Sequence, residues 1–205
     1  MKIQILERNE REMKILIEEI NPQFANALRR IMIGEIPILA VDTVDFLQND
    51  SVLYNEVITH RLALIPLVFD PKEFHSRDEH EGKKACSKCE VVFAIDKKGP
   101  SVVYSKDLKS SNDDVKPLYD TIPIVELLEG QKLKLEATAI LGFGKVHAKW
   151  QAANVGYQYE DNKNPDKIIF NIESVSGLDV QQIFLSAIEV LKHKSKEFQK
   201  GLEKV

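Results

Sequence analysis

Apolar and polar residues alternate along the first twenty positions of the chain, which is the pattern of half-buried β-strands. Segments 2–7 and 12–20 both follow it, and the turn-like sequence RNER lies between them. A hairpin with one buried face is therefore predicted. Its inward-facing side chains would be Ile3, Ile5, Met13, Ile15 and Ile17.

Helical signals follow the hairpin. Asn21 is a suitable cap and Gly34 a suitable end for a helix over 22–33, and Ser51 is a possible cap for a second helix that Pro66 ends. The remaining strands are predicted at the segments PILAVDTVDFLQ, EVVFAI, SVVYSKDL, TIPIVELL, KLKLEATAIL and KIIFNIESV. An α+β fold is expected from these elements.

The helix over 22–33 has more apolar surface than one face of a sheet requires. Its main stripe consists of Phe24, Ala27, Leu28 and Ile31. Ala25, Met32 and Ile33 lie off this stripe, so a partner chain is predicted to cover them. The adjacent Arg29 and Arg30 form either a solvated edge or the anchor of an interface, and both interpretations remain open.

The last predicted helix, which starts near Asp179, carries an apolar repeat with alternating spacings of four and three residues. This seam consists of Phe184, Ile188, Leu191, Ser195, Phe198, Leu202 and Val205. A heptad-type seam surrounded by lysine and glutamate is typical of a helix that lies along another helix. Packing on the chain's own sheet is the alternative. Two such helices in one small chain favour assembly with a partner.

Composition narrows the class of protein. The 205 residues carry a net charge of −4, which provides no basic field for phosphates, so direct DNA binding is not predicted. Residues 1–12 lack the apolar run of a secretory signal, and no segment approaches the roughly 18 apolar residues of a membrane span. A cytoplasmic protein without membrane contact is expected.

The two cysteines, Cys86 and Cys89, have the spacing of a zinc knuckle. A structural zinc site needs four ligands, so His75 and His80 would have to supply the other two. A cysteine pair without metal is the alternative, and no cofactor is predicted. A stand-alone zinc- or redox-binding module at these cysteines is a rival function.

Three long segments closely resemble the D subunit of archaeal RNA polymerase, a relative of the third-largest subunit of eukaryotic RNA polymerase II and of bacterial α. They are FANALRRIMIGEIPILAVDTVDF, SVLYNEVITHRLALIPL and GFGKVHAKW. The resemblance, which spans nearly the whole chain, implies a discontinuous dimerisation domain over 1–45 and 165–205, made of a sheet and two helices. It implies a mainly β insert domain over 46–164.

The resemblance also implies the partners. In that family the D subunit pairs with the smaller subunit L, and the pair is the platform for the two large subunits and the small subunits N and P. The surplus apolar surface is accordingly assigned to subunit L, at Phe24, Ala25, Leu28, Arg29, Arg30, Met32, Phe184, Ile188, Leu191, Phe198 and Leu202. Self-pairing, as in bacterial α, is a second rival.

Further polar contacts are expected from the same resemblance, to the large second subunit and the small subunits. They involve His60 and Arg61 of the second helix, and Lys145, His147 and Lys149 of the GFGKVHAKW segment. The sequence near these histidines offers no nucleophile, paired carboxylates or orienting group, so this subunit of a nucleotidyltransferase complex is not expected to be catalytic by itself.

Some family members hold an iron–sulfur cluster in an additional ferredoxin-like domain, which is inserted before the last strand. Such clusters require several cysteine thiolates. In this sequence the corresponding position contains EDNKNPD, which has no cysteine. The cluster domain is therefore predicted to be absent, and no redox role is expected from it.

Overall fold

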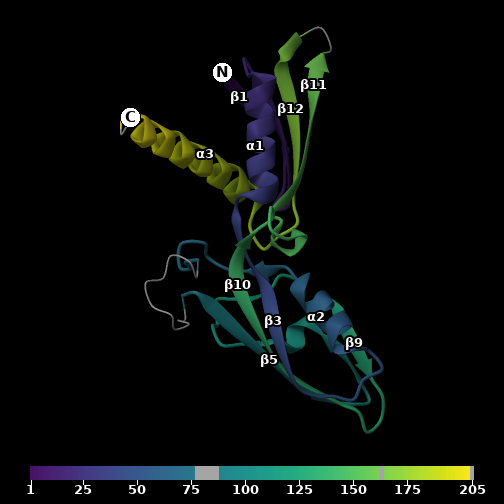
Figure 1. Ribbon diagram of the computed structural model, residues 1–205. Helices are drawn as coiled ribbons and strands as arrows, with labels where there is room; N and C mark the ends of the chain where they lie inside the picture. Colours follow the sequence, from purple (N-terminus) through teal and green to yellow (C-terminus); the bar gives the residue numbers. More distant parts are fainter. Residues whose placement is uncertain (77–87, 162–163, 204–205) are drawn as a thin grey trace. The chain divides into compact units, whose positions relative to one another are not determined.

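The computed structural model describes residues 1–76, 88–161 and 164–203, which form a mixed α+β fold (Figure 1). The helices are α1 (Pro22–Gly34), α2 (Asn55–Ala63) and α3 (Val180–Leu202). The longer strands are β1 (Lys2–Arg8), β2 (Glu12–Glu18), β3 (Pro37–Asn49), β5 (Glu90–Lys98), β9 (Pro123–Leu127), β10 (Lys132–Phe143), β11 (Ala153–Asp161) and β12 (Asn164–Ser174). The short strands are β4 (Leu67–Val68), β6 (Ser101–Tyr104), β7 (Lys109–Ser110) and β8 (Lys116–Pro117).

The chain divides into two compact units. Met1–Pro37 and Phe143–Val205 form the first unit, and Ile38–Gly142 form the second, so the second is inserted into the first in sequence. The boundaries differ from the expected ones, because β11 pairs with β12 in the sheet of the first unit. The expected insert over 46–164, whose bounds the resemblance implies, includes this strand.

The first unit is built on an antiparallel sheet in the order β1-β2-β12-β11. Ile15 lies opposite Phe170 and Ile17 lies opposite Ile168, so the alternation of each strand places these four buried side chains on one face. Helix α1 packs over β11 and β12, while α3 packs over β12 and β2. The core of the unit lies between this face and the two helices.

Helix α1 begins and ends where its sequence predicts. The Asn21 side chain accepts a hydrogen bond from the Gln23 N–H at 2.8 Å, Pro22 occupies the first turn, and the helix ends at Gly34. Its buried face differs from the predicted one, because it consists of Ala25, Leu28, Ile31, Met32 and Gly34. Phe24, which the prediction places on the stripe that covers the sheet, is half-exposed.

The second unit contains the sheet β3-β10-β5-β7, the pairs β4–β8 and β6–β9, and helix α2. Strand β10 confirms the predicted alternation for its buried Leu133, Leu135, Ala137 and Ala139. Helix α2 is shorter than predicted, because Ser51 does not cap it. The Ser51 hydroxyl instead donates to the Asn49 Oδ1 at 2.6 Å, in a turn that precedes the helix.

The helices of this fold differ from membrane-spanning segments. Among the described residues, no helix combines the length and the apolar character that crossing a bilayer requires.

Candidate protein-interaction surface

Helix α3 is fixed to the first unit at its beginning. The Asp179 side chain accepts from the Gln181 N–H at 2.6 Å, while the Gln182 Oε1 accepts from the Asp179 N–H at 3.1 Å, which completes a capping box. The predicted start near Asp179 is thereby confirmed. The Arg11 guanidinium donates to the carbonyls of Ser174 and Ser176 at 2.8 and 2.6 Å, so the β1–β2 turn holds the loop that leads into α3.

Burial along α3 ends after its first two turns. Val180, Ile183, Phe184 and Ala187 are buried, whereas every residue from Lys192 to Glu203 is exposed or partly exposed. The apolar seam nevertheless continues, because Ile188, Phe198 and Leu202 lie on it and are exposed. Figure 1 shows this half of α3 extending away from α1 and the sheet of its unit. The seam therefore continues past the part of α3 that the chain itself covers.

Strand β1 adds apolar surface that the alternating pattern predicts to be inside. Ile5 lies opposite Ile15 and Ile3 lies opposite Ile17, so all four side chains share the helix-covered face of the sheet. Ile5 is 53% exposed, whereas Ile15 is 2% exposed. The predicted burial of Ile3 and Ile5 is wrong for the chain by itself. The reason is that α1 and α3 pack over β11, β12 and β2, so β1 lies at the edge of the covered area.

Several residues assigned to a partner interface are covered within the chain. Ala25, Leu28 and Met32 of α1 and Phe184 of α3 are buried by the chain's own residues. The expectation that a partner is needed to cover them is therefore corrected. Their period-3.6 spacing could not show which of two apolar faces meets the sheet. Leu191 is half-buried, at the point where the chain's own cover ends.

The two arginines of α1 face different surroundings. Arg29 is half-buried, and its Nε donates to the Asn26 Oδ1 at 3.3 Å on the same helix. Arg30 is exposed. Both guanidiniums therefore remain at the surface of the first unit. This position fits a solvated edge as well as the anchor of an interface.

The predicted polar contact residues lie in two different units. In the second unit His60 is exposed, and the Arg61 Nη1 donates to the Ile124 carbonyl at 2.7 Å, which ties α2 to β9. In the first unit Lys145 and His147 are exposed in the loop after β10.

Aromatic residues support the basic side chains of this loop. The Lys149 Nζ lies 4.2 Å from the Trp150 ring centroid, and the Lys145 Nζ lies 5.4 Å from that of Phe143. Gly144 packs so closely on α1 that a Cβ there would lie 2.4 Å from the Ile33 carbonyl oxygen. The loop therefore presents positive charge from a fixed backbone.

The proposed zinc ligands are only partly within the described residues. Cys89 is buried and His75 is exposed, while Cys86 and His80 lie outside the described residues. In the part of the chain that the structure describes, no group of three or more His, Cys, Asp or Glu side chains is arranged to hold a metal ion.

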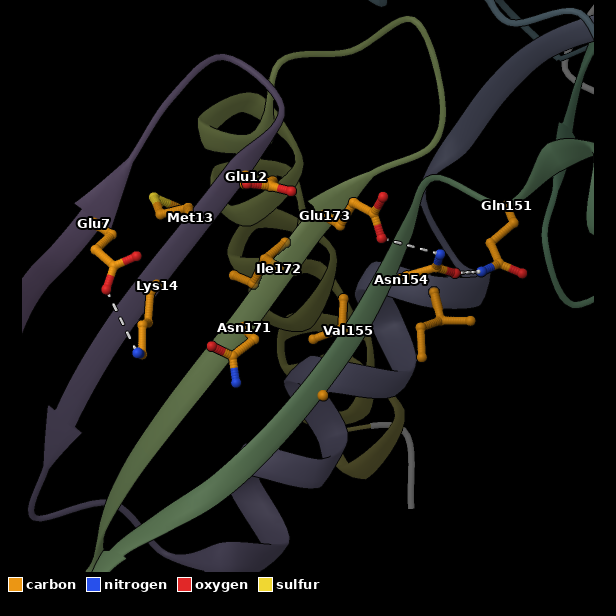
Figure 2. A pocket seen from close by; sticks show the side chains of 12 residues that line it. Glu7, Glu12, Met13, Lys14, Gln151, Asn154, Val155, Asn171, Ile172 and Glu173 are labelled. Carbon is orange, nitrogen blue, oxygen red and sulfur yellow. Dashed lines mark hydrogen bonds and ion pairs between the residues drawn. The ribbon is translucent and has the colours of Figure 1, made fainter.

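The face of the first sheet opposite the helices carries a cleft of about 650 Å³ (Figure 2). Glu12 and Glu173 lie directly opposite each other on β2 and β12, and the Asn154 Nδ2 donates to the Glu173 carboxylate at 3.4 Å. The Lys14 Nζ lies 3.5 Å from the Glu7 carboxylate. Sequence reasoning missed this cleft, because it depends on strand order. The alternation of polar residues along each strand was its only signal.

Farther along the same face, Lys167 lies between two carboxylates, at 2.7 Å from Glu18 and 3.3 Å from Glu160. The hydrogen bond from Lys167 lowers the pKa of Glu18, and the hydrogen bonds to Glu18 and Glu160 raise the pKa of Lys167. Charges on this part of the face are thus paired within the chain. The open face is polar, in contrast to the helix side, where apolar residues are left uncovered.

Comparisons with known proteins agree with these features. Residues 35–159 match the family described as the RNA polymerase Rpb3/RpoA insert domain. The chain is 46% identical over 159 residues to DNA-directed RNA polymerase subunit Rpo3 of Pyrococcus furiosus, a match that covers 78% of this chain and 59% of that relative. It is 41% identical over 185 residues to Rpo3 of Methanosphaera stadtmanae, covering 87% and 67% of the two chains.

A third relative is covered over most of its length. Rpo3 of Methanocaldococcus jannaschii is 37% identical over 182 residues, which are 89% of this chain and 86% of that relative. The match with the Pyrococcus relative, in contrast, spans about three fifths of its length. The family profile and the relatives together show that this chain belongs to the archaeal DNA-directed RNA polymerase Rpo3 family, whose members are also called D subunits, within the Rpb3/RpoA group.

Proposed function

We propose that this chain is a non-catalytic assembly subunit of archaeal RNA polymerase, and that its first unit is a dimerisation domain that pairs with the smaller subunit L. The observation that carries the proposal is the second half of α3, where Ile188, Phe198 and Leu202 are exposed along one seam. Ile3 and Ile5 extend this apolar surface onto β1. These five residues are called the pairing surface below. Membership of the Rpo3 family supports the assignment.

The free energies of burial and of association indicate how large the interface must be. Fully burying one large apolar side chain contributes about 1.5–3 kcal/mol, and the five side chains of the pairing surface are already partly covered in the free chain, so burying the rest contributes only about 4–8 kcal/mol. Association costs about 4–15 kcal/mol in lost freedom of motion, so these five residues by themselves offset at most the lower half of that range. A stable pair therefore needs further contacts, as in obligate interfaces that bury more than about 2,000 Å². Phe24 and Leu185, both exposed on the helices of the first unit, are available to extend it.

We also propose that the basic loop after β10 and helix α2 contact the large second subunit and the small subunits N and P. The exposed His60, Lys145 and His147 support this role, because they present polar and basic groups from fixed elements. The polymerase active site would lie on other subunits, and the chain would act in transcription by holding the enzyme together in the cytoplasm.

A self-pairing dimer is the second candidate. The pairing surface favours it because an uncovered apolar seam can also be covered by a second copy in a twofold arrangement. Native mass measurement distinguishes the two candidates, since they predict one copy of this chain with one subunit L or two copies of this chain.

The proposed function is tested by co-expression with subunits L, N and P of the same organism, followed by native mass measurement. The complex with L should form with the unmodified chain and be lost in Phe198→Asp, because pairing would bury an unpaired carboxylate. Val52→Asp is the matched control, since Val52 is exposed on the second unit. A chain that stays monomeric with L present, or that forms only a homodimer, would contradict the proposal.

The rival zinc or redox module is tested on the same complex. Metal analysis and the double variant Cys86→Ser, Cys89→Ser separate the two functions. Complex formation that is unchanged in the double variant, without bound zinc in the unmodified chain, supports the assembly role. Stoichiometric zinc and a loss of complex in the double variant would favour the metal site.

A further inference from the structure

The exposed half of α3 carries one small polar residue on its apolar seam, Ser195. An α-helix turns by about 100° per residue, so Ser195 lies within about 60° of both Leu191 and Phe198 around the helix axis. The Ser195 side chain is exposed, as are those of Phe198 and Leu202. The seam therefore changes from large to small and back to large in the part of α3 that the chain does not cover.

The Ser195 hydroxyl does not require a polar group of a partner. In a helix a serine hydroxyl can donate to the backbone carbonyl four residues earlier, which here is that of Leu191. Burial of Ser195 at an interface would therefore not leave its hydroxyl unsatisfied. Size is what distinguishes Ser195 from the other seam residues, because the side chains of Leu191 and Phe198 extend farther from the helix axis.

The position of Ser195 determines what a partner must place over it. Leu191 and Phe198 are seven residues apart, which is about 10 Å along the helix axis, and Ser195 lies between them. A partner that covers both of these large side chains must also cover Ser195. The cores of stable interfaces pack at the density of protein interiors, so partner atoms must fill the space above this small side chain.

Water is the alternative occupant of this space. An enclosed water needs two to four polar partners. On the seam itself Ser195 offers one hydroxyl between two apolar side chains, Leu191 and Phe198. Its polar neighbours one turn away, Lys192 and Gln199, lie toward one side of the seam, and both are exposed to solvent. An apolar side chain of the partner therefore fits this position better than a water molecule.

We propose that a large apolar side chain of subunit L packs on α3 at Ser195, between Leu191 and Phe198, and that the small size of residue 195 is a specificity determinant of the pairing. The inference rests on the proposed pairing with L through α3, and it adds the point at which the partner inserts into the seam. The contact resembles a knob in a hole, with Leu191 and Phe198 as two walls of the hole.

A second copy of the chain could supply a similar side chain. In antiparallel self-pairing along the seam, an alignment that places Leu191 opposite Leu202 also places Ser195 opposite Phe198 of the copy. The mass of the complex therefore has to be measured together with its affinity.

The test measures the affinity of subunit L, from the same organism, for the full-length chain and its variants. Ser195→Leu should lower the affinity about tenfold or more, because it overfills the space that the partner's side chain occupies. Without such a contact the added leucine would leave the affinity unchanged or raise it, since it enlarges the apolar seam. Ser195→Ala should bind L as tightly as the unmodified chain, because alanine is equally small. Lys196→Leu is the control, since it adds the same side chain about 130° around the axis from the seam.

The outcomes separate this inference from the proposed function. Equal or tighter binding of L by Ser195→Leu would overturn the inference, as would an equal loss in Ser195→Ala, which would assign the effect to the hydroxyl, or in Lys196→Leu. A homodimer that Ser195→Leu dissolves while binding of L is unchanged would overturn the assignment to L. If Phe198→Asp still abolished binding of L in these cases, the pairing function would stand. Retained binding of Phe198→Asp would contradict the pairing function itself.

Discussion

Phe184 and Phe198 occupy the same seam of the same helix, yet one is 8% and the other 70% exposed. They lie two heptads apart, so the repeat gives them equivalent positions on α3. The chain's own residues cover the first half of the helix, and nothing in the described part of the chain covers the second. One apolar repeat therefore has two roles. Its beginning stabilises the first unit, and its end is available to another chain.

The largest effect is expected where the seam is enclosed. Phe184→Ala should lower the free energy of unfolding by about 3–5 kcal/mol, because it leaves a cavity where the chain's own residues bury this side chain. Urea unfolding followed by the fluorescence of Trp150, the single tryptophan of the chain, reports on the first unit. Phe198→Ala is the matched variant and should leave the unfolding midpoint unchanged. Equal destabilisation by both would remove the distinction between the two halves.

The second-largest effect is expected on binding to subunit L, from a change in the exposed second half of α3. Phe198→Asp should weaken binding to subunit L by about 2 kcal/mol or more, which is roughly a thirtyfold rise in Kd. Calorimetry measures this change, and circular dichroism verifies that the helix is retained. Leu28→Asp is unsuitable for this purpose because Leu28 is buried in the chain's own core. Full affinity of Phe198→Asp would show that the partner does not cover the end of α3.

A smaller effect on binding is expected from β1, the strand at the edge of the first sheet. Ile5→Ala should weaken binding to subunit L by about 1 kcal/mol, since part of this side chain is already covered in the free chain. Gln4→Ala is the control, because Gln4 is the neighbouring residue and its side chain lies on the opposite face of the sheet. If the two variants had the same affinity for L, β1 would not belong to the pairing surface.

The smallest effect is expected at the boundary between the two halves. Lys194→Ala removes the ion pair with Glu35, which tethers the exposed half of α3 to the end of α1. Because Lys194 is half-exposed, the expected loss of stability is below about 1 kcal/mol. Unfolding at low and high salt measures it, and the difference from the unmodified chain should shrink as salt rises.

Local signals in the sequence predict the elements well. Asn21 and Gly34 bound α1, Asp179 marks the start of α3, and the alternation in KLKLEATAIL identifies β10. In each case the physical cause acts within a few residues, through a cap or through the two faces of a strand. Ser51 shows the limit of such signals, because its hydroxyl bonds to Asn49 instead of capping a helix.

The burial of particular faces could not be predicted from the sequence in the same way. Ile5 and Ile15 belong to equally clear alternating patterns, but only Ile15 lies beneath a helix. Ala25 and Met32 lie off the stripe that contains Phe24, whereas the packing of α1 on the sheet buries both of them and leaves Phe24 half-exposed. These outcomes depend on strand order and helix placement, which involve residues far apart in the chain.

The central claim is that a different chain covers the second half of α3. Hydrogen–deuterium exchange along α3, with and without subunit L, tests it most directly. The account predicts that residues 180–187 exchange slowly in both samples, and that residues 188–202 exchange fast alone and become protected when L is added. Equal exchange of residues 188–202 with and without L, whether fast or slow, would contradict the account.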